Sequence, residues 1–326
     1  GQMTDNEFDR HAMEETFTQQ MTISRRLQYQ ILKENGKTPD TGFSMVEELK
    51  KDGVRVVYQG VEGAYSHIAA LEYFGEQGDL YHVRTWQDAM DAVERGEADY
   101  AVIPIENSSA GAVSDNYDLL VAHDNVIVGE IFLPVRHGLL GLPGASEADI
   151  RVVYSHPQAL SQCSVFLSGL SEDVKVIPYP NTAEAAKMVA EAERSACAAI
   201  SSRSCGELYG LDVLCPSIQD KGNNYTRFIC ISKNLEIYPG ADKTSIMLTT
   251  PHRPGSLYNV LGKFYELGIN LLKLESRPLP DRDFEFMFYF DVKTSIYSEE
   301  FIQMIDELSQ ISDEFRYLGS YSEVIE

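Results

Sequence analysis

The sequence is poor in basic residues, and it has no hydrophobic run long enough to suggest a membrane span. Lys and Arg together number 27 against 50 Asp and Glu, which gives a formal net charge of −23. This acidic balance argues against a nucleic acid partner, because such binding relies on cations that neutralise phosphates. A membrane-spanning helix needs roughly 20 apolar residues in succession, and no stretch approaches that length. We therefore expect neither a nucleic acid nor a membrane as partner.

Motifs for metal, redox and dinucleotide chemistry are also missing. The five cysteines are odd in number and none has CxxC spacing, and the seven histidines form no HExxH pair. The dinucleotide fingerprint GxGxxG is absent as well. These absences argue against a metal. No signal-peptide pattern opens the chain, so we expect free thiols in the reducing cytoplasm.

The N-terminal region, residues 1–50, is predicted to hold one long helix and a linker. Met13, Phe17 and Met21 recur every four residues and place an apolar stripe along residues 5–35. A single amphipathic helix cannot bury its own apolar face. We therefore expect it to pack on the next domain or on another chain.

Residues 54–235 alternate strand and helix patterns many times, which is typical of an α/β domain. The number of elements predicts two α/β lobes with a ligand between them. We place lobe 1 at about 54–128 and 212–235, and lobe 2 at about 129–211, so that the chain crosses near 129 and returns near 212.

Four polar turns accompany the predicted strands, at 60–66, 106–111, 155–158 and 223–228. The first is a glycine turn that exposes backbone N–H groups to an anion, and the last combines amides, a hydroxyl and a guanidinium. Each turn by itself could be only a tight turn or a helix cap. Because open α/β sheets bind ligands at the carboxyl ends of their strands, the set together favours a ligand site.

Residues 243–322 change character and follow the order βαββαβ, which predicts a small ferredoxin-like domain. Its first strand turns into a helix at 251–257, where backbone donors could hold a carboxylate.

These motifs together resemble one known family, the prephenate dehydratases with a C-terminal ACT regulatory domain, over about 54–322. The resemblance implies a two-lobed catalytic domain like that of periplasmic binding proteins, followed by a ferredoxin-like ACT domain. Ser256 stands where the family usually has Ala. The motifs that carry the resemblance are Gly-Val-Glu-Gly-Ala-Tyr-Ser at 60–66, Pro-Ile-Glu-Asn-Ser at 104–108, Ser-His-Pro-Gln-Ala-Leu at 155–160, Asn-Tyr-Thr-Arg-Phe at 224–228 and Glu-Ser-Arg-Pro at 275–278.

The first helix resembles the last helix of an AroQ-type chorismate mutase, with Ser24 and Gln28 where that helix contributes site residues. The long preceding helix, with the cations that a dianionic substrate requires, is missing. We therefore expect no mutase activity and a structural role for this helix.

The resemblance implies that prephenate, in L-phenylalanine biosynthesis, is converted to phenylpyruvate, water and carbon dioxide without a cofactor. Thr226 would hydrogen-bond the leaving hydroxyl, and Arg227 would either clamp a carboxylate or brace its loop. A Thr hydroxyl is a poor acid, which leaves Glu106 or His156 as sources of the proton. Catalytic candidates are thus Thr226, Arg227 and Glu106. The candidate substrate-binding residues are Ser66, Asn107, Ser108, Ser155, His156, Thr182, Asn224 and Phe228.

The ACT resemblance further implies feedback by L-phenylalanine at an interface of a dimer or tetramer. The alternative is that this domain only holds the oligomer together. Two other functions remain open, an arogenate dehydratase and a non-enzymatic two-lobed sensor of small molecules. The candidate effector residues are Pro254, Gly255, Ser256, Leu257, Glu275, Ser276 and Arg277.

Overall fold

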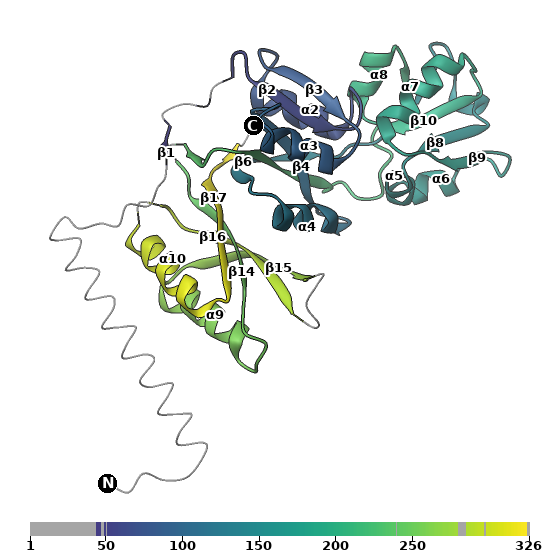
Figure 1. Ribbon diagram of the computed structural model, residues 1–326. Helices are drawn as coiled ribbons and strands as arrows, with labels where there is room; N and C mark the ends of the chain where they lie inside the picture. Colours follow the sequence, from purple (N-terminus) through teal and green to yellow (C-terminus); the bar gives the residue numbers. More distant parts are fainter. Residues whose placement is uncertain are drawn as a thin grey trace, which may run out of the picture.

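Figure 1 shows the computed structural model, in which residues 44–46, 49, 51–238, 240–279, 285–296 and 298–324 are described. The predicted N-terminal helix, the linker, Ser24 and Gln28 lie outside the described residues, so the expectations about them stay predictions. In the described part of the chain, every helix is too short or too polar to cross a bilayer.

Lobe 1 is built on a seven-stranded sheet. Nearly every residue along its central strands is buried, so both faces of the sheet are covered. The helix α2 (Tyr65–Phe74) covers one face, and α3 (Trp86–Glu94) and α4 (Ser114–Ala122) cover the other. The strand order is β18 (Glu323–Val324), β6 (Val126–Pro134), β12 (Tyr225–Ser232), β4 (Tyr100–Asn107), β2 (Arg55–Gln59) and β3 (Asp79–Val83), with β5 (Gly111–Ala112) beside β4.

Lobe 2 is a five-stranded sheet with its own two apolar cores. Its strands lie in the order β11 (Asp212–Cys215), β7 (Gly138–Gly141), β10 (Cys197–Ser201), β8 (Val152–Ser155) and β9 (Lys175–Pro178). Its helices are α5 (Pro157–Gln162), α6 (Ser164–Ser168), α7 (Thr182–Ala192), α8 (Arg203–Tyr209) and the 3₁₀ turn η1 (Glu147–Asp149).

The crossings between the lobes differ from the predicted ones. Strand β6 pairs with β12 along its whole length and so belongs to lobe 1 as far as Pro134. Strand β11 pairs with β7 and belongs to lobe 2. The chain therefore crosses after residue 134 instead of near 129, and it returns after residue 215 instead of near 212.

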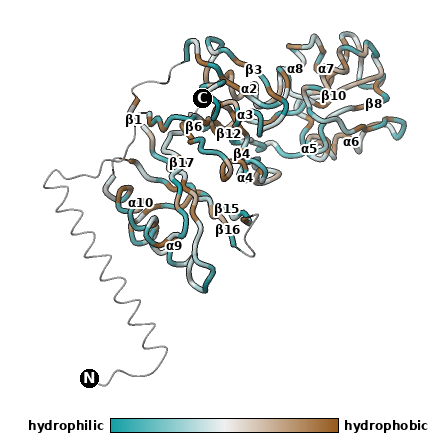
Figure 2. The backbone as a smooth tube through the Cα atoms, in the orientation of Figure 1, coloured by the Kyte–Doolittle hydropathy of each residue, from teal (hydrophilic) through white to brown (hydrophobic). Residues whose placement is uncertain are grey.

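The C-terminal domain has the predicted βαββαβ order in a four-stranded sheet. Two helices cover one face of that sheet, and Figure 2 shows hydrophobic and hydrophilic residues interleaved along both of them. Its elements are β14 (Lys243–Thr249), α9 (Ser256–Glu266), β15 (Asn270–Pro278), β16 (Phe286–Lys293), α10 (Glu299–Ile311) and β17 (Glu314–Tyr321), and the sheet order is β15-β16-β14-β17. A short parallel pair, β1 (Ser44–Met45) with β13 (Glu236–Ile237), precedes it.

The second face of this C-terminal sheet packs directly on lobe 1 (Figure 1). Tyr289 of β16 lies edge-on to Tyr117 of α4, with ring centroids 4.9 Å apart. Gly319 of β17 approaches the backbone of β6 so closely that a Cβ there would lie 2.0 Å from the carbonyl oxygen of Ile127. The two domains thus share one apolar core, and a shift of one sheet is felt by the other.

Candidate functional site

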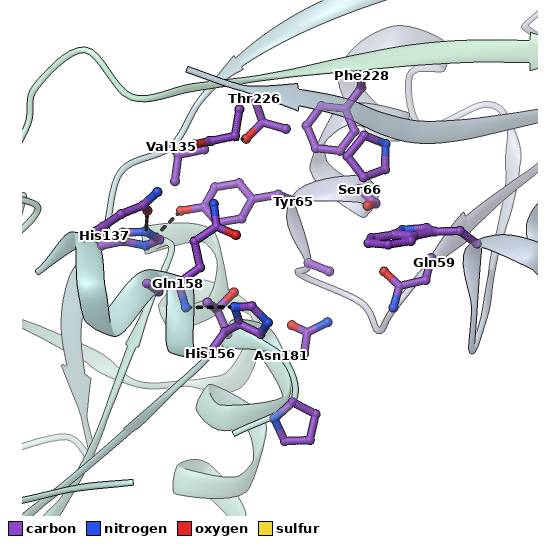
Figure 3. A pocket seen from close by; sticks show the side chains of 18 residues that line it. Gln59, Tyr65, Ser66, Val135, His137, His156, Gln158, Asn181, Thr226 and Phe228 are labelled. Carbon is purple, nitrogen blue, oxygen red and sulfur yellow. Dashed lines mark hydrogen bonds between the residues drawn. The ribbon is translucent and has the colours of Figure 1, made fainter. Parts of the chain in front are cut away.

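A cavity of about 290 Å³ lies between the lobes (Figure 3). In Figure 3, Thr226 and Phe228 reach into it from strand β12, opposite His156 and Asn181 of lobe 2. Most of its lining follows the end of a strand or begins a helix, as expected for a ligand site of open sheets. The lining consists of Gln59, Ala64, Tyr65, Ser66, Trp86, Pro104, Asn107, Val135, His137, His156, Gln158, Ala159, Gln162, Pro180, Asn181, Thr182, Thr226 and Phe228.

The described cavity lining contains no Lys, Arg, Asp or Glu; its polar groups are mainly amides, hydroxyls and imidazoles. Four of the described helices begin at the cavity: α2 at Tyr65, α3 at Trp86, α5 at Pro157 and α7 at Thr182. The N-terminus of a helix carries unpaired N–H groups and a partial positive charge. The cavity can therefore attract an anion in a strongly acidic protein without a buried cation.

The orientation of Asn107 determines what Thr226 can do. The Oδ1 atom of Asn107 accepts hydrogen bonds from the backbone nitrogens of Ser109, at 3.0 Å, and Ala110, at 2.9 Å. Its Nδ2 therefore faces Thr226 and lies 2.9 Å from Oγ1. An amide nitrogen can only donate, so the Thr226 oxygen accepts this bond and its own hydrogen is left for a ligand.

The hydrogen bonds behind the cavity wall also have defined donors and acceptors. Asn107 Nδ2 also donates to Oδ1 of the buried Asn224, at 2.9 Å, and Asn224 Nδ2 donates to Gln162 Oε1, at 3.0 Å. His137 Nε2 lies 3.0 Å from the same oxygen and must donate to it. Burial lowers the pKa of His137, which agrees with a neutral ring that carries its hydrogen on Nε2. A chain of oriented amides thus connects His137 to Thr226.

His156 lines the cavity and also begins a helix. Its Nδ1 accepts a hydrogen bond from the backbone nitrogen of Gln158, at 3.2 Å, and so caps α5. Burial lowers the pKa of His156, which favours the neutral ring near neutral pH. Its Nε2 then carries the hydrogen and is a donor.

Arg227 and Glu106, two of the three predicted catalytic residues, do not reach the cavity. Successive side chains of a strand point to opposite faces, so Thr226 faces the cavity and Arg227 faces away from it. Arg227 is buried, with its guanidinium 2.6 Å from Glu130 and 2.5 Å from Asp291. The Glu106 side chain also points away from the cavity and contacts Lys273 of the C-terminal domain. Of the two roles expected for Arg227, the carboxylate clamp in the cavity is wrong, and the bracing of its loop stays a prediction.

Three predicted substrate-binding residues also lie behind the cavity wall. Ser108 Oγ donates to the carbonyl of Asn223, at 3.0 Å, and Ser155 Oγ donates to the carbonyl of Ile200, at 2.6 Å. Asn224 belongs to the amide chain described above. These side chains hold loops in place, whereas five others line the cavity as expected: Ser66, Asn107, His156, Thr182 and Phe228.

The candidate effector residues lie at one end of the C-terminal sheet. β14 and β15 both pair antiparallel with β16, so they run in the same direction. The turn at 251–257 after β14 and the segment 275–278 at the end of β15 therefore lie at the same edge. Gly255 has φ +85° and caps α9, which is a conformation that favours glycine. Arg277 additionally contacts lobe 1, at 2.8 and 2.7 Å from Asp118.

One group of side chains in the described residues has metal-like spacing: Asp91, Glu94 and His123. His123 Nε2 lies 2.9 Å from Asp91 and 3.9 Å from Glu94, and Asp91 also pairs with Arg95 at 3.0 Å. The group does not line the cavity, so the chemistry of the cavity does not draw on it.

Comparison with known proteins identifies the family of this chain. The family model described as "Prephenate dehydratase" matches residues 56–236. The chain belongs to the prephenate dehydratase family. It is 36% identical over 272 residues to a bifunctional chorismate mutase/prephenate dehydratase of Aquifex aeolicus, with 83% of this chain and 74% of that relative covered. It is 38% identical over 285 residues to the chloroplastic arogenate dehydratase/prephenate dehydratase 1 of Arabidopsis thaliana, with 82% and 72% covered.

Solved structures of the family's fold agree. A prephenate dehydratase from Arthrobacter aurescens in complex with L-Phe has a TM-score of 0.76 and 29% identity, with 82% of this chain and 90% of that chain covered. GqqA, described as a novel type of quorum quenching acylase, has a TM-score of 0.75 and 32% identity, with 83% and 98% covered. The expected fold class, a two-lobed α/β domain followed by a ferredoxin-like domain, is confirmed.

Proposed function

We propose that this chain converts prephenate to phenylpyruvate, water and carbon dioxide in the cavity between its lobes. Membership of the prephenate dehydratase family supports this proposal. The observation that carries it is the hydrogen bond from Asn107 to the Thr226 oxygen, because it leaves the Thr226 hydrogen free for a departing hydroxyl. A substrate with two carboxylates suits a lining of neutral donors and helix N-termini.

The reaction needs positioning more than strong acid chemistry. As the ring carboxylate leaves as carbon dioxide, its electron pair enters the ring and the carbon–oxygen bond breaks on the other side. The described lining offers that carboxylate no Lys or Arg, so no ion pair stabilises it before it leaves. Thr226 donates a hydrogen bond to the departing oxygen, and aromatisation of the ring supplies the driving force.

Of the two proton sources considered from the sequence, only His156 lines the cavity. Its lowered pKa means that the ring is neutral near neutral pH, so it donates a hydrogen bond instead of transferring a proton outright. We infer that the departing oxygen leaves under two hydrogen bonds, from Thr226 and His156. One proton from solvent completes the balance, because dianionic prephenate and one proton give monoanionic phenylpyruvate, carbon dioxide and water.

We also propose that L-phenylalanine regulates the enzyme at 252–257 and 275–278 of the C-terminal domain, which then acts as an ACT domain. The L-Phe complex of the Arthrobacter relative supports this effector class. Leu272 and Leu274 are exposed on the edge strand β15, together with Phe286 of β16, and supply an apolar surface for self-association.

Arogenate differs from prephenate by an amino group in place of the keto group. An ammonium group in a closed site is expected to have a carboxylate partner. The described cavity lining offers no Asp or Glu, which favours the keto substrate. Acyl transfer, the activity named for GqqA, would need a base on the Thr226 hydroxyl, and Asn107 is instead a donor to it.

One assay decides among these functions. Purified protein is given prephenate or arogenate, each with and without L-phenylalanine, and phenylpyruvate and phenylalanine are measured. We expect phenylpyruvate release from prephenate, with a lower rate when L-phenylalanine is added. Release of phenylalanine from arogenate alone would replace the proposal by the arogenate function, and no product from either substrate would exclude both.

A further inference from the structure

The strands β4 and β12 have two different faces at the point where they reach the cavity. They pair antiparallel, with Asn107 opposite Thr226 and Glu106 opposite Arg227. The first pair faces the cavity. Because the side chains of a strand alternate, the second pair faces the C-terminal domain. Each cavity residue therefore has a charged neighbour on the far side of the same strand.

The C-terminal domain presents a complementary pair to this far side. Lys273 of β15 lies opposite Asp291 of β16 in the register of that sheet. Lys273 Nζ lies 2.7 Å from Glu106 Oε1, and Arg227 Nη1 lies 2.5 Å from Asp291 Oδ2. Two cross-strand pairs, one from each sheet, thus meet with opposite charges. We call Glu106, Arg227, Lys273 and Asp291 the four-charge junction.

Burial makes the Arg227–Asp291 half of this junction stiff. The side chains of Arg227 and Asp291 are 5% and 1% exposed, whereas those of Lys273 and Glu106 are 14% and 35% exposed. Arg227 also contacts Tyr321 of β17, at 3.0 Å. A buried charge that loses its partner is strongly unfavourable, so the Arg227–Asp291 contact resists movement of one sheet relative to the other.

Burial by itself would lower the pKa of Arg227, but Tyr321, Asp291, Tyr289 and Glu130 hold it well above its ordinary value. These neighbours therefore hold Arg227 in its charged form. The bond to Asp291 consequently cannot be relieved by loss of a proton.

We propose that Glu106 and Arg227 are positioning residues, through which Lys273 and Asp291 of the C-terminal domain hold Asn107 and Thr226 in the geometry that the reaction needs. This inference rests on the proposed function. It also joins the cavity to regulation, because Lys273 lies two residues before Glu275 on the strand that carries the predicted effector segment. An effector that shifts the end of β15 would act on Glu106 through Lys273.

The chain offers a matched control for this contact. Arg277 and Asp118 form a second ion pair between β15 and lobe 1, at 2.7 Å. Asp118 lies on α4, and neither it nor an adjacent residue lines the cavity. Asp118→Asn therefore weakens the docking of the same strand without touching the strands that carry Asn107 and Thr226.

The test is a double-mutant cycle with Glu106→Gln, Lys273→Met and both together, measured as kcat and KM with prephenate. We expect each single variant to lower kcat by about 10- to 100-fold, the range for a displaced catalytic group, with KM within about twofold. The double variant should be no slower than the slower single one, because both remove the same contact. Asp118→Asn should leave kcat unchanged.

Each other outcome overturns the inference. Normal kcat in Lys273→Met would mean that Glu106 acts without the C-terminal domain, and additive losses in the double variant would mean two independent roles. An equal loss in Asp118→Asn would mean that general docking alone matters. Wild-type protein that releases no phenylpyruvate would instead contradict the proposed function, which is a separate result.

Folding and effector binding complete the design. Circular dichroism and thermal melting of each variant show whether it folds; the cycle uses Glu106 and Lys273 because these are the more exposed members of the junction. In folded Lys273→Met, calorimetry should show L-phenylalanine still binding while its effect on kcat is reduced at least several-fold. An effector response equal to that of wild type would overturn the regulatory part.

Discussion

The two faces of the β4–β12 strand pair differ in charge: one carries neutral side chains and the other charged ones. Toward the cavity, Asn107 and Thr226 are neutral and their hydrogen bonds are directional, so that one hydroxyl hydrogen remains for a ligand. Toward the C-terminal domain, Glu106 and Arg227 are acidic and basic side chains that form ion pairs with Lys273, and with Glu130 and Asp291, respectively. A neutral face can bind a dianion and release its products, whereas separating a buried charge from its partner is strongly unfavourable. Substrate binding and the proposed coupling are thus separated by the pleat of a single strand pair.

The largest expected effect comes from removing the free hydroxyl on the neutral face. Thr226→Ala should lower kcat by about 100-fold or more, which is the scale of a lost acid–base or oxyanion contact. Thr226→Ser retains the hydroxyl and should keep most of the activity. Steady-state kinetics with prephenate give the rates, and circular dichroism shows that both variants fold. Near-normal turnover in Thr226→Ala would remove this residue from the mechanism.

On the charged face, the expected effect is on stability as well as on rate. Arg227→Met leaves the buried Asp291 without its cation and leaves Glu130 with Lys243 alone, which costs about 3–5 kcal/mol. The melting temperature should fall by roughly 10 °C for a chain of this size. Thermal unfolding followed by circular dichroism measures it.

Thr226→Ala is the matched comparison for Arg227→Met, because it alters the next residue on the same strand. Its melting temperature should change by less than a third as much. If the melting temperature fell equally in both variants, the proposed difference in role between the two faces would be wrong.

The sequence patterns predicted the fold and the segments that line the cavity, but not the difference between the two faces of the β4–β12 strand pair. The stretch at 223–228 was interpreted as a polar turn before a strand, whereas β12 begins at Tyr225. Only in a strand does a period of two send Thr226 and Arg227 to opposite faces. Arg227 interrupts the apolar pattern that marks strands. Its burial could not be predicted from that pattern, because its partners lie 64 and 97 residues away in the chain.

Other cavity residues were missed for a similar reason. His137 lies just after the crossing, which was expected near 129 and in fact follows β6. Gln162 lies one helical turn after Gln158 on α5, so the i, i+4 spacing could have suggested that both line the site. Gln59 directly precedes the glycine turn, and Tyr65 lies within the 60–66 motif, of which only Ser66 is predicted to bind substrate. Their positions depend on how the two sheets meet, which local sequence patterns do not encode.

The neutrality of the cavity face can be tested by adding one charge to it. Asn181→Asp keeps the cap of α7, because a carboxylate accepts the bond from the backbone nitrogen of Ala183 as well as the amide does. Its charge should repel dianionic prephenate and raise KM about tenfold, the equivalent of about 1.4 kcal/mol at an effective dielectric near 20. Gln77→Glu adds the same charge at an exposed position and should leave KM unchanged. An unaltered KM in Asn181→Asp would mean that the substrate anions lie far from α7.

The smallest expected effect is a dependence of stability on pH that originates on the cavity side. Burial lowers the pKa of both His137 and His156 below the ordinary 6.5. Below that value the unfolded chain binds protons that the folded chain does not, so stability rises with pH and is lost as the pH falls through about 6.5. The melting temperature should therefore be level near pH 7–8 and decline toward pH 5. His137→Gln, which can still donate to Gln162, should flatten the decline, whereas exposed His82→Gln should not. An equal slope in both variants would assign the acid sensitivity to other groups.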